Sequence, residues 1–449
     1  MRRVGGALSG WTLGLLLCGA ACAPAAASEG KVAPLRDAFL FAFPVYEMAR
    51  TREAAVARTG NLNTLRHRTT LSDASHRNVT TPNNDTLYSS SWLDLSAGPV
   101  ILTTPTAPDR YHSVALMDMF TDHFAVLGTR RDGGKGKAFL IHGPRWSGEV
   151  PAGMEAIRAP MDDAWLIVRV LVRGDDDLEA ARAVQRAFRL EAAPGAAAPQ
   201  RPDGSARFPD DDPAVFLERV NAALGRGPLP PVHAARVARF AGAGIRPGNA
   251  AAWQSLDAAT RDAWRKDFRS FRDALRGGLQ EVGASRNGWS YPAPGIGEFG
   301  TDDHYRSRVA LGGLGALPQA EAVYLSARTT GDEISLDGTE AHCLQIPPGI
   351  PVGAFWSLSL YEIAPDGRLF FTANPVGRYS IGSETRSIVR DPDGGIRVRM
   401  QHAAPHASRT NWLPAPAGPF ALTFRAYLPG RAFIDGGFEM PAVERCRGP

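Results

Sequence analysis

Residues 78–98, NVTTPNNDTLYSSSWLDLSAG, bring amides, a carboxylate, hydroxyls and two large aromatic rings into one short segment. Asp85 has the chemistry of a general acid or base, and Tyr88 that of a proton donor. Asn84 and Trp92 offer an amide and a flat ring, which suit a polar or carbohydrate-like ligand. Turn formation explains part of the same pattern, since Asn and Asp side chains bond nearby backbone amides. A site and a simple turn before a strand are therefore both open interpretations.

Asp118 is a second candidate acid or base. It shares one predicted strand face with Val114, Leu116 and Phe120. A carboxylate among apolar neighbours loses hydration, which raises its pKa and suits acid-base catalysis. The alternative is an aspartate at a strand end that accepts backbone hydrogen bonds, and the sequence does not choose between the two.

The C-terminal half contributes further candidates. Arg378 and Tyr379 follow a turn and would supply a guanidinium that stabilises negative charge and a hydroxyl that donates a proton. A surface salt bridge is the alternative role for Arg378. The remaining ligand-binding candidates in this half are aromatic or amide side chains, namely Trp356, Tyr361, Asn411 and Trp412.

Several catalytic signatures are absent from the sequence. It has no His-Glu-x-x-His motif and no Gly-x-Ser-x-Gly elbow, and no Cys-x-x-Cys pair follows residue 27. The ten histidines are scattered, and His402 and His406 are separated by Ala-Ala-Pro, which spoils helical spacing. We therefore expect no metal and no other cofactor.

Residues 1–27 have the form of a secretory signal peptide, with two arginines before an apolar run and small residues leading to Ala27. Cleavage after Ala27 would deliver a periplasmic or secreted protein without a transmembrane anchor, and lipid attachment at Cys22 is the alternative. The net charge of +4 falls further with the two arginines. A nucleic-acid partner therefore has no electrostatic basis.

The cysteines beyond residue 27 are Cys343 and Cys446. In an oxidising compartment they either form a bridge or remain a pair of thiols.

Period-two runs predict antiparallel strands on both sides of a helical middle. The first strands lie within residues 28–175, after a leading helix at 32–50 that Pro44 interrupts. Residues 176–317 read as a helical connecting region with an Ala/Pro-rich linker, and residues 318–449 read as a second β domain. We predict a mainly β protein in which two antiparallel β-sandwich or jelly-roll domains are joined by helices.

Several long motifs are similar to those of a bacterial exported family. They include FAFPVYEMAR and PNNDTLYSSSWLDLSAGPV in the N-terminal half, and PVGAFWSLSLYE and NPVGRYSIG in the C-terminal half. These motifs resemble a family that pairs an N-terminal domain of unknown function, numbered 1254, with a C-terminal one, numbered 1214. The resemblance implies sandwich or jelly-roll domains with a helical middle, and it carries over no catalytic residues.

These features predict an exported two-domain protein that binds a small polar or carbohydrate-like ligand between its β domains. As an enzyme it would use metal-independent acid-base chemistry of the hydrolase or lyase type, and Asp85, Tyr88, Asp118 and Arg378 would converge on one concave pocket. The rival hypothesis is a non-enzymatic cell-envelope binding or assembly protein. A homo-oligomer is an option that the sequence leaves open.

Overall fold

The computed structural model describes residues 35–446 except 61, 78, 202–203, 278–282 and 406–409. The predicted signal peptide and Cys22 lie outside the described residues, so these predictions stay untested. The described residues form one compact unit.

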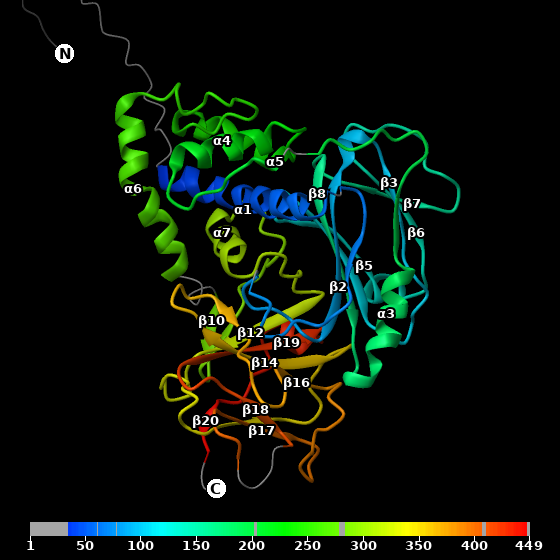
Figure 1. Ribbon diagram of the computed structural model, residues 1–449, viewed down its shortest axis with the longest axis vertical. Coiled ribbons are helices and arrows are strands. Elements are labelled where there is room, and N and C mark those ends of the chain that lie inside the picture. The colour runs from blue at the N-terminus through cyan, green and yellow to red at the C-terminus, as the bar shows by residue number, and fades with distance from the viewer. Residues whose placement is uncertain are drawn as a thin grey trace, which may run out of the picture. The chain divides into compact units, whose positions relative to one another are not determined.

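Most of the long helices gather in one region of this unit, whereas α3 (Leu178–Ala187) lies beside the N-terminal sheets (Figure 1). The α-helices within the described residues are α1 (Leu35–Thr59), α2 (Thr129–Asp132), α3 (Leu178–Ala187), α4 (Pro213–Leu224), α5 (Pro231–Val237), α6 (Ala258–Gly277), α7 (Asp303–Gly312) and α8 (Arg431–Ile434), with short 3₁₀ helices at Leu95–Ala97, Asp175–Asp177 and Ala238–Ala243. The first helix continues through Pro44 and ends later than predicted. Its Phe39 stacks on Phe216 of α4 at 5.4 Å and meets Phe268 of α6 edge-on at 5.6 Å. These rings belong to a core that joins α1, α4 and α6.

The N-terminal half contains two sheets that share a hydrophobic core. Their strand orders are β1-β2-β8-β4-β5 and β7-β6-β3-β9. The strands are β1 (Arg66–Arg68), β2 (Thr86–Asp94), β3 (Val100–Thr103), β4 (His112–Asp118), β5 (His123–Gly128), β6 (Ala138–His142), β7 (Glu155–Arg158), β8 (Asp163–Leu171) and β9 (Arg189–Ala192). Leu93, Val114 and Leu166 of the first sheet share this core with Leu102 and Phe139 of the second.

The C-terminal half repeats this arrangement with other strands. One sheet has the order β10-β11-β12-β19-β14-β15, with β16 also paired to β14, and the other has the order β18-β17-β13-β20. The strands are β10 (Ala284–Arg286), β11 (Trp289–Tyr291), β12 (Ala322–Ala327), β13 (His342–Ile346), β14 (Trp356–Ile363), β15 (Leu369–Phe370), β16 (Ser380–Gly382), β17 (Ile396–Gln401), β18 (Trp412–Pro414), β19 (Phe420–Tyr427) and β20 (Glu444–Arg445). A disulfide between Cys343 and Cys446 ties the C-terminal segment to β13.

The predicted antiparallel strands and helical middle are both present. The pairings are antiparallel except for β6–β7 and β17–β18 among the described strands. With 27% strand and 26% helix the chain is a mixed protein, so "mainly β" understates the helices. The sequence underestimated helix in part because α1 extends to Thr59 instead of ending near residue 50. The sandwich or jelly-roll assignment and the domain boundaries stay predictions.

The two halves meet along a smaller core of their own. Tyr111 and Leu171 of the N-terminal half share it with Phe355 and Tyr427 of the C-terminal half. The Tyr111 and Tyr427 rings lie 5.3 Å apart, and the Phe355 and Tyr427 rings stack at 4.1 Å. This contact holds the sheet of β2 and β8 against the sheet of β12, β19 and β14.

Candidate functional site

Two polar strand faces are buried where the halves meet. Tyr88 of β2 lies beside Arg169 of β8 in the strand register. Arg425 of β19 lies between Tyr324 of β12 and Ser357 of β14. Side chains alternate along a strand, so these residues occupy the faces opposite the two apolar cores. A polar strand face normally meets solvent, yet Arg169 is only 6% exposed and Arg425 only 3%.

The loop at residues 81–85, just before β2, fastens one face to the other. Its main-chain carbonyls accept hydrogen bonds from Arg425 Nη2 at 3.1 Å and from Tyr361 Oη at 2.7 Å. Within the loop, Asn83 Nδ2 donates to Tyr427 Oη at 2.8 Å. The loop of the N-terminal half is therefore bound along the polar face of the C-terminal sheet.

Asp85 is attached to the C-terminal half through its carboxylate. Ser357 Oγ donates to Oδ2, and Ser380 Oγ donates to Oδ1 at 3.0 Å. The turn itself is made by Asn83, whose Oδ1 accepts from the Asp85 backbone N–H at 2.6 Å. Burial raises the pKa of Asp85, while Arg425 and the two serine hydroxyls oppose that rise. Turn formation alone therefore does not explain this aspartate.

Tyr88 lies among arginines. Its ring centroid is 5.4 Å from Arg169 Cζ and 5.7 Å from Arg68 Cζ. Burial alone would raise the pKa of the phenol, but the charges of Arg169 and Arg425 outweigh burial and lower it below the usual 10.0. The side chain is half-buried. We call Asp85, Tyr88, Arg169, Tyr324 and Arg425 the Tyr88 site.

The two buried arginines of this site bind neutral groups. Arg169 Nη2 donates to the Gly315 carbonyl at 2.7 Å, and its Nη1 has no hydrogen-bond partner among the described residues. Arg425 donates to Ser359 Oγ at 2.8 Å and to Tyr361 Oη at 2.7 Å. Neither guanidinium forms an ion pair within 4.0 Å with a described residue. The site therefore holds more positive charge than its single carboxylate balances.

Tyr324 lies near this charge, and Asn84 directly precedes Asp85 in the loop before β2. Both are half-buried, and Asn84 Oδ1 is a buried acceptor without a partner among the described residues. Tyr324 Oη accepts from the Leu317 backbone N–H at 3.2 Å. Burial raises the pKa of this phenol, which stays neutral. The arrangement can hold an anion, remove a proton at Tyr88 and supply one at Tyr324.

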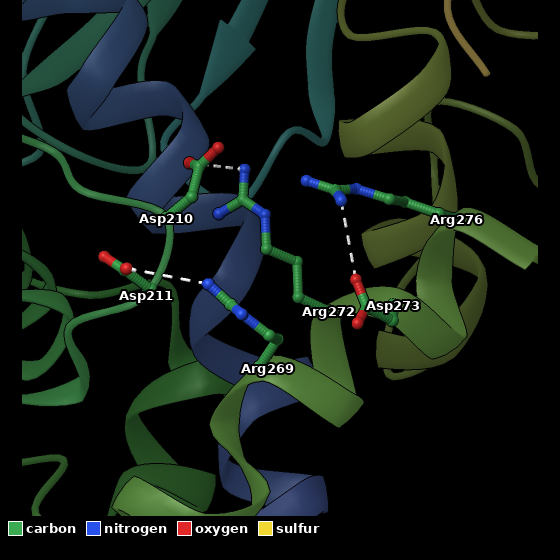
Figure 2. Close-up of a pocket in the computed structure, with 6 residues that line it drawn as sticks. All are labelled: Asp210, Asp211, Arg269, Arg272, Asp273 and Arg276. Carbon is green, nitrogen blue, oxygen red and sulfur yellow. Dashed lines mark hydrogen bonds and ion pairs between the residues drawn. The ribbon is translucent and has the colours of Figure 1, made fainter. Parts of the chain in front are cut away.

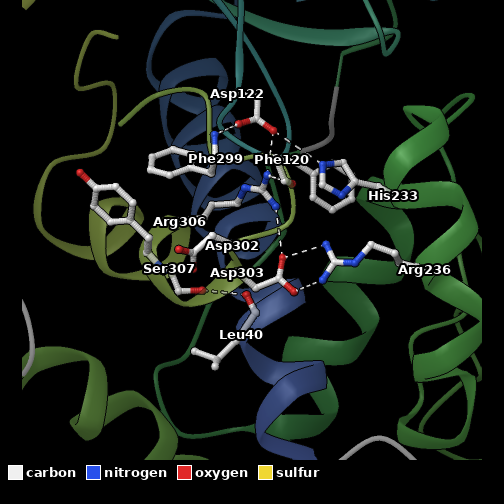
Figure 3. Close-up of polar contacts among 12 residues, drawn as sticks. Leu40, Phe120, Asp122, His233, Arg236, Phe299, Asp302, Asp303, Arg306 and Ser307 are labelled. Atoms are coloured by element: carbon white, nitrogen blue, oxygen red, sulfur yellow. Dashed lines mark hydrogen bonds and ion pairs between the residues drawn. The ribbon is translucent and has the colours of Figure 1, made fainter. Parts of the chain in front are cut away.

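Asp118 belongs to a different cluster. Its Oδ1 accepts from the backbone N–H groups of Phe120 at 2.9 Å and of Asp122 at 3.1 Å. Burial, followed by the charge of Asp122, raises the pKa of Asp118 to about 7. Figure 3 shows Asp122 in contact with Arg306 and His233. Both interpretations of Asp118 thus apply in part, because it is desolvated and it also accepts backbone hydrogen bonds.

Arg378 and Asn411 bind the main chain instead of facing Tyr88. Arg378 Nη1 donates to the carbonyls of Thr410 and Trp412 at 2.7 and 2.9 Å. Asn411 exchanges hydrogen bonds with the backbone of Val389. Both side chains therefore hold the start of β18 and the segment that leads into it.

The predicted aromatic candidates divide between the cores and the interface. Trp92 stacks on Trp165 at 5.1 Å, and Trp356 stacks on Phe424 at 5.5 Å in the C-terminal core. Trp412 is buried, with its indole N–H donating to the Gln401 carbonyl. Tyr361 reaches the Tyr88 site through Arg425, and the ring of half-buried Tyr379 lies 4.9 Å from Phe371, which stacks on Tyr361.

Two family models match the chain, in the order expected from its motifs. Protein of unknown function (DUF1254) matches residues 62–192, and Protein of unknown function (DUF1214) matches residues 321–431. The chain therefore carries a DUF1254 region followed by a DUF1214 region. The resemblance seen in the sequence is confirmed. Within this DUF1254–DUF1214 chain the first domain supplies Asp85, Tyr88 and Arg169 to the Tyr88 site, and the second supplies Tyr324 and Arg425.

A solved structure shares the fold of this DUF1254–DUF1214 chain. The VPA0106 protein from Vibrio parahaemolyticus is 23% identical and superposes with a TM-score of 0.70, covering 92% of this chain and 99% of its own. An uncharacterized protein from Burkholderia cenocepacia is 12% identical, with a TM-score of 0.44 over 91% of this chain and 88% of its own. No curated protein matches the chain.

Sequence reasoning missed three residues of the site, namely Arg169, Tyr324 and Arg425. Arg169 is a lone basic residue in DAWLIVRVLV, and Arg425 is one in FALTFRAYLP. A charge flanked by apolar residues in a strand indicates a buried polar face, and this was the available signal. For Tyr324 the sequence held none, because one tyrosine in an alternating strand is ordinary.

A hollow of about 410 Å³ lies elsewhere, and none of the predicted site residues lines it. Figure 2 shows its lining residues, in which Arg272 pairs with Asp210 at 2.6 Å and Arg276 with Asp273 at 3.4 Å. Its opposite charges are close to balanced. Within the described part of the chain, no cluster of three or more His, Cys, Asp or Glu side chains could hold a metal ion. No helix in that part is long and apolar enough to cross a membrane.

Proposed function

We propose that the chain binds a small carboxylate-bearing, carbohydrate-like ligand at the Tyr88 site and processes it by metal-independent acid-base chemistry. One observation supports this most strongly. Arg169 and Arg425 are almost fully buried and form no ion pair with a described residue. The one carboxylate of the site, Asp85, interacts with Arg425 and leaves the second buried guanidinium unbalanced. An unbalanced buried charge is destabilising, and a carboxylate matches the fork of donors of a guanidinium. An anionic ligand between the two arginines would supply that counter-charge.

The residues divide into positioning and chemical roles. Arg169 and Arg425 would hold the ligand carboxylate, and Tyr88 would be the base because its phenol loses a proton more readily than a free tyrosine. Asp85, held by two serines, would position the loop before β2. The charge-stabilising role predicted for Arg378 passes to the two buried arginines, while acid-base roles for Asp118 and Tyr379 stay predictions.

Binding of sugar acids tests this function directly. Titration calorimetry would compare galacturonate and glucuronate with galactose and glucose at one ionic strength. We expect binding of the acids alone. Arg169→Met should weaken that binding by about 10- to 100-fold, as expected for a lost charge-assisted hydrogen bond.

Arg265→Met is the matched control, because Arg265 is exposed on α6 and pairs with Asp262 at 2.9 Å. This variant should bind like the unmodified protein. Equal binding of acids and neutral sugars, or unchanged binding by Arg169→Met, would overturn the proposal.

A non-enzymatic binding or assembly role is the second candidate, and the C-terminal contacts favour it for that region. Arg378, Asn411 and Trp412 have their polar atoms bonded to the main chain, as in a structural scaffold. Under this alternative no variant of the Tyr88 site changes binding.

We further propose that the protein is exported and that each half is a β-sandwich. The Cys343–Cys446 disulfide supports export, because such bonds persist in oxidising compartments. The paired sheets around a common core in each half support the sandwich assignment.

A further inference from the structure

We infer that Tyr324 is the general acid that works with Tyr88, and that the substrates are chains of uronic acids cleaved by β-elimination. The inference rests on the proposed function and extends it to a substrate class and a reaction.

Tyr324 and Arg169 are fixed to the same short segment. The Leu317 backbone N–H donates to Tyr324 Oη at 3.2 Å, and Arg169 Nη2 donates to the Gly315 carbonyl at 2.7 Å, two residues away. The Tyr88 ring lies 5.4 Å from the same guanidinium. Arg169 therefore lies close enough to a phenol of each matched domain for its charge to act on both Tyr88 and Tyr324.

The two phenols differ in their environments. Arginine charges lower the pKa of Tyr88, whereas burial raises the pKa of Tyr324. A pair of titratable groups driven in opposite directions is the pattern of an acid and a base. The Tyr324 hydroxyl accepts a hydrogen bond, and no described residue accepts its proton. That proton is available to a ligand.

The count of carboxylates favours elimination over hydrolysis. Glycosidases generally use two carboxyl groups on opposite sides of the bond. The Tyr88 site has one, Asp85, and both of its oxygens accept serine hydroxyls. Glu321, buried nearby in the same interface, is bound by Tyr111 Oη at 2.8 Å and Arg130 Nε at 2.6 Å. The arginines suit a different reaction, because neutralising a carboxylate makes the adjacent C–H more acidic.

The step balances without water or an oxidant. The Tyr88 phenolate takes the proton from the carbon next to the carboxylate, and the electron pair of that C–H bond forms a double bond to the neighbouring carbon. The C–O bond on that neighbour breaks, and its electron pair stays on the leaving sugar oxygen. Tyr324 gives this oxygen its proton. Return of one proton from Tyr88 to Tyr324 through solvent restores the starting state.

The test separates binding from turnover. The mature protein would be incubated with 4-linked oligogalacturonate, oligoglucuronate and oligomannuronate. Products would be followed by the ultraviolet absorbance of the new conjugated double bond and by mass. We expect products whose masses sum to that of the substrate. Tyr324→Phe should lower turnover at least 100-fold while uronate binding changes less than threefold.

A leaving group that needs no proton distinguishes the acid from the base. On a 4-fluoro uronate, where fluoride leaves, Tyr324→Phe should recover activity and Tyr88→Phe should not. Tyr291→Phe is the control, since its hydroxyl only accepts from the Met440 N–H in the C-terminal core.

Each other outcome is decisive. Products whose masses sum to that of the substrate plus one water would show hydrolysis. This result would overturn elimination and leave the proposed function intact. Binding without any turnover would overturn this inference alone, and a lack of binding would overturn both. Full activity of Tyr324→Phe on the oligomers would remove Tyr324 from the reaction.

Discussion

The ring of Tyr88 lies 5.4 Å from Cζ of Arg169, its neighbour across the β2–β8 pairing. A phenol and a guanidinium side by side on a buried strand face stabilise one another when the phenol is ionised. Packing of the two matched domains against one another does not by itself require a phenol and a guanidinium at their interface.

Turnover should rise with pH as Tyr88 loses its proton. Its pKa is lowered from 10.0, so the base form becomes populated below that pH. The midpoint of the rise in kcat/KM should therefore lie below 10, and Tyr88→Phe should abolish the rise. A difference titration of tyrosinate absorbance between the two proteins checks the same ionisation, and a midpoint at or above 10 would contradict it.

Substitution of two buried arginines should change the free energy of unfolding by very different amounts. Arg306 pairs with Asp122 at 2.7 Å and with Asp303 at 3.2 Å. Asp303 also pairs with Arg236, so Arg306→Met leaves Asp122 as the carboxylate without an arginine and should cost about 3–5 kcal/mol. Arg169→Met leaves no described carboxylate without an ion-pair partner, so it should change the free energy of unfolding by less than about 1 kcal/mol. Urea unfolding followed by tryptophan fluorescence measures both, and equal losses would show that Arg169 is a structural residue.

Asp118 should make stability fall as pH rises. Its pKa is about 7 in the fold against the usual 3.8 of an aspartate, so between these pH values the folded state binds the extra proton. The stabilisation is complete below about pH 4 and is lost as pH rises through 7, at about 1.4 kcal/mol for each pKa unit. Asp118→Asn keeps an acceptor for the Phe120 and Asp122 amides and should flatten this dependence. Melting temperatures at pH 5 and 8 compare the two proteins, and parallel profiles would contradict the assignment.

Reducing the Cys343–Cys446 bond should loosen the C-terminal half. The bond closes a separation of 103 residues, and its loss should cost about 2–5 kcal/mol. Cys446→Ser should lower the melting temperature to that of the reduced protein, while ligand binding stays unchanged. Mass analysis after alkylation without reductant should find Cys343 unmodified, and a labelled thiol there would contradict the bond.

Part of the site follows from local sequence, and part depends on tertiary pairing. Turn chemistry and strand alternation were enough to select Asp85 and Tyr88. They could not show that Asn83 makes the hydrogen bond of the turn and that the Asp85 carboxylate binds Ser357 instead. That arrangement depends on a strand residue 272 positions away in the sequence. The convergence expected for Asp118 and Arg378 does not occur in any contact between described residues. Asp118 accepts hydrogen bonds from nearby backbone N–H groups beside a separate ion-pair cluster. Arg378 donates to the carbonyls of Thr410 and Trp412 and to the hydroxyl of Ser387.

The fold shows the same division. Period-two patterns located many strands correctly, because each strand has one apolar face directed at a core. Nothing in those patterns says that the polar faces of β2 and β19 cover one another. An isolated sequence pattern treats a polar face as solvent-exposed, which explains why Arg169 and Arg425 were not selected.

The loop at residues 81–85 also constrains how this chain can be recombined. It lies within the DUF1254 match, yet its carbonyls, Asn83 and Asp85 bond to side chains of the DUF1214 half. In a hybrid that joins the first domain of this chain to the second domain of a relative, this loop would face a surface that lacks its hydrogen-bond partners. A compatible exchange would move the five loop residues together with the C-terminal half, although more than 200 residues of sequence separate them.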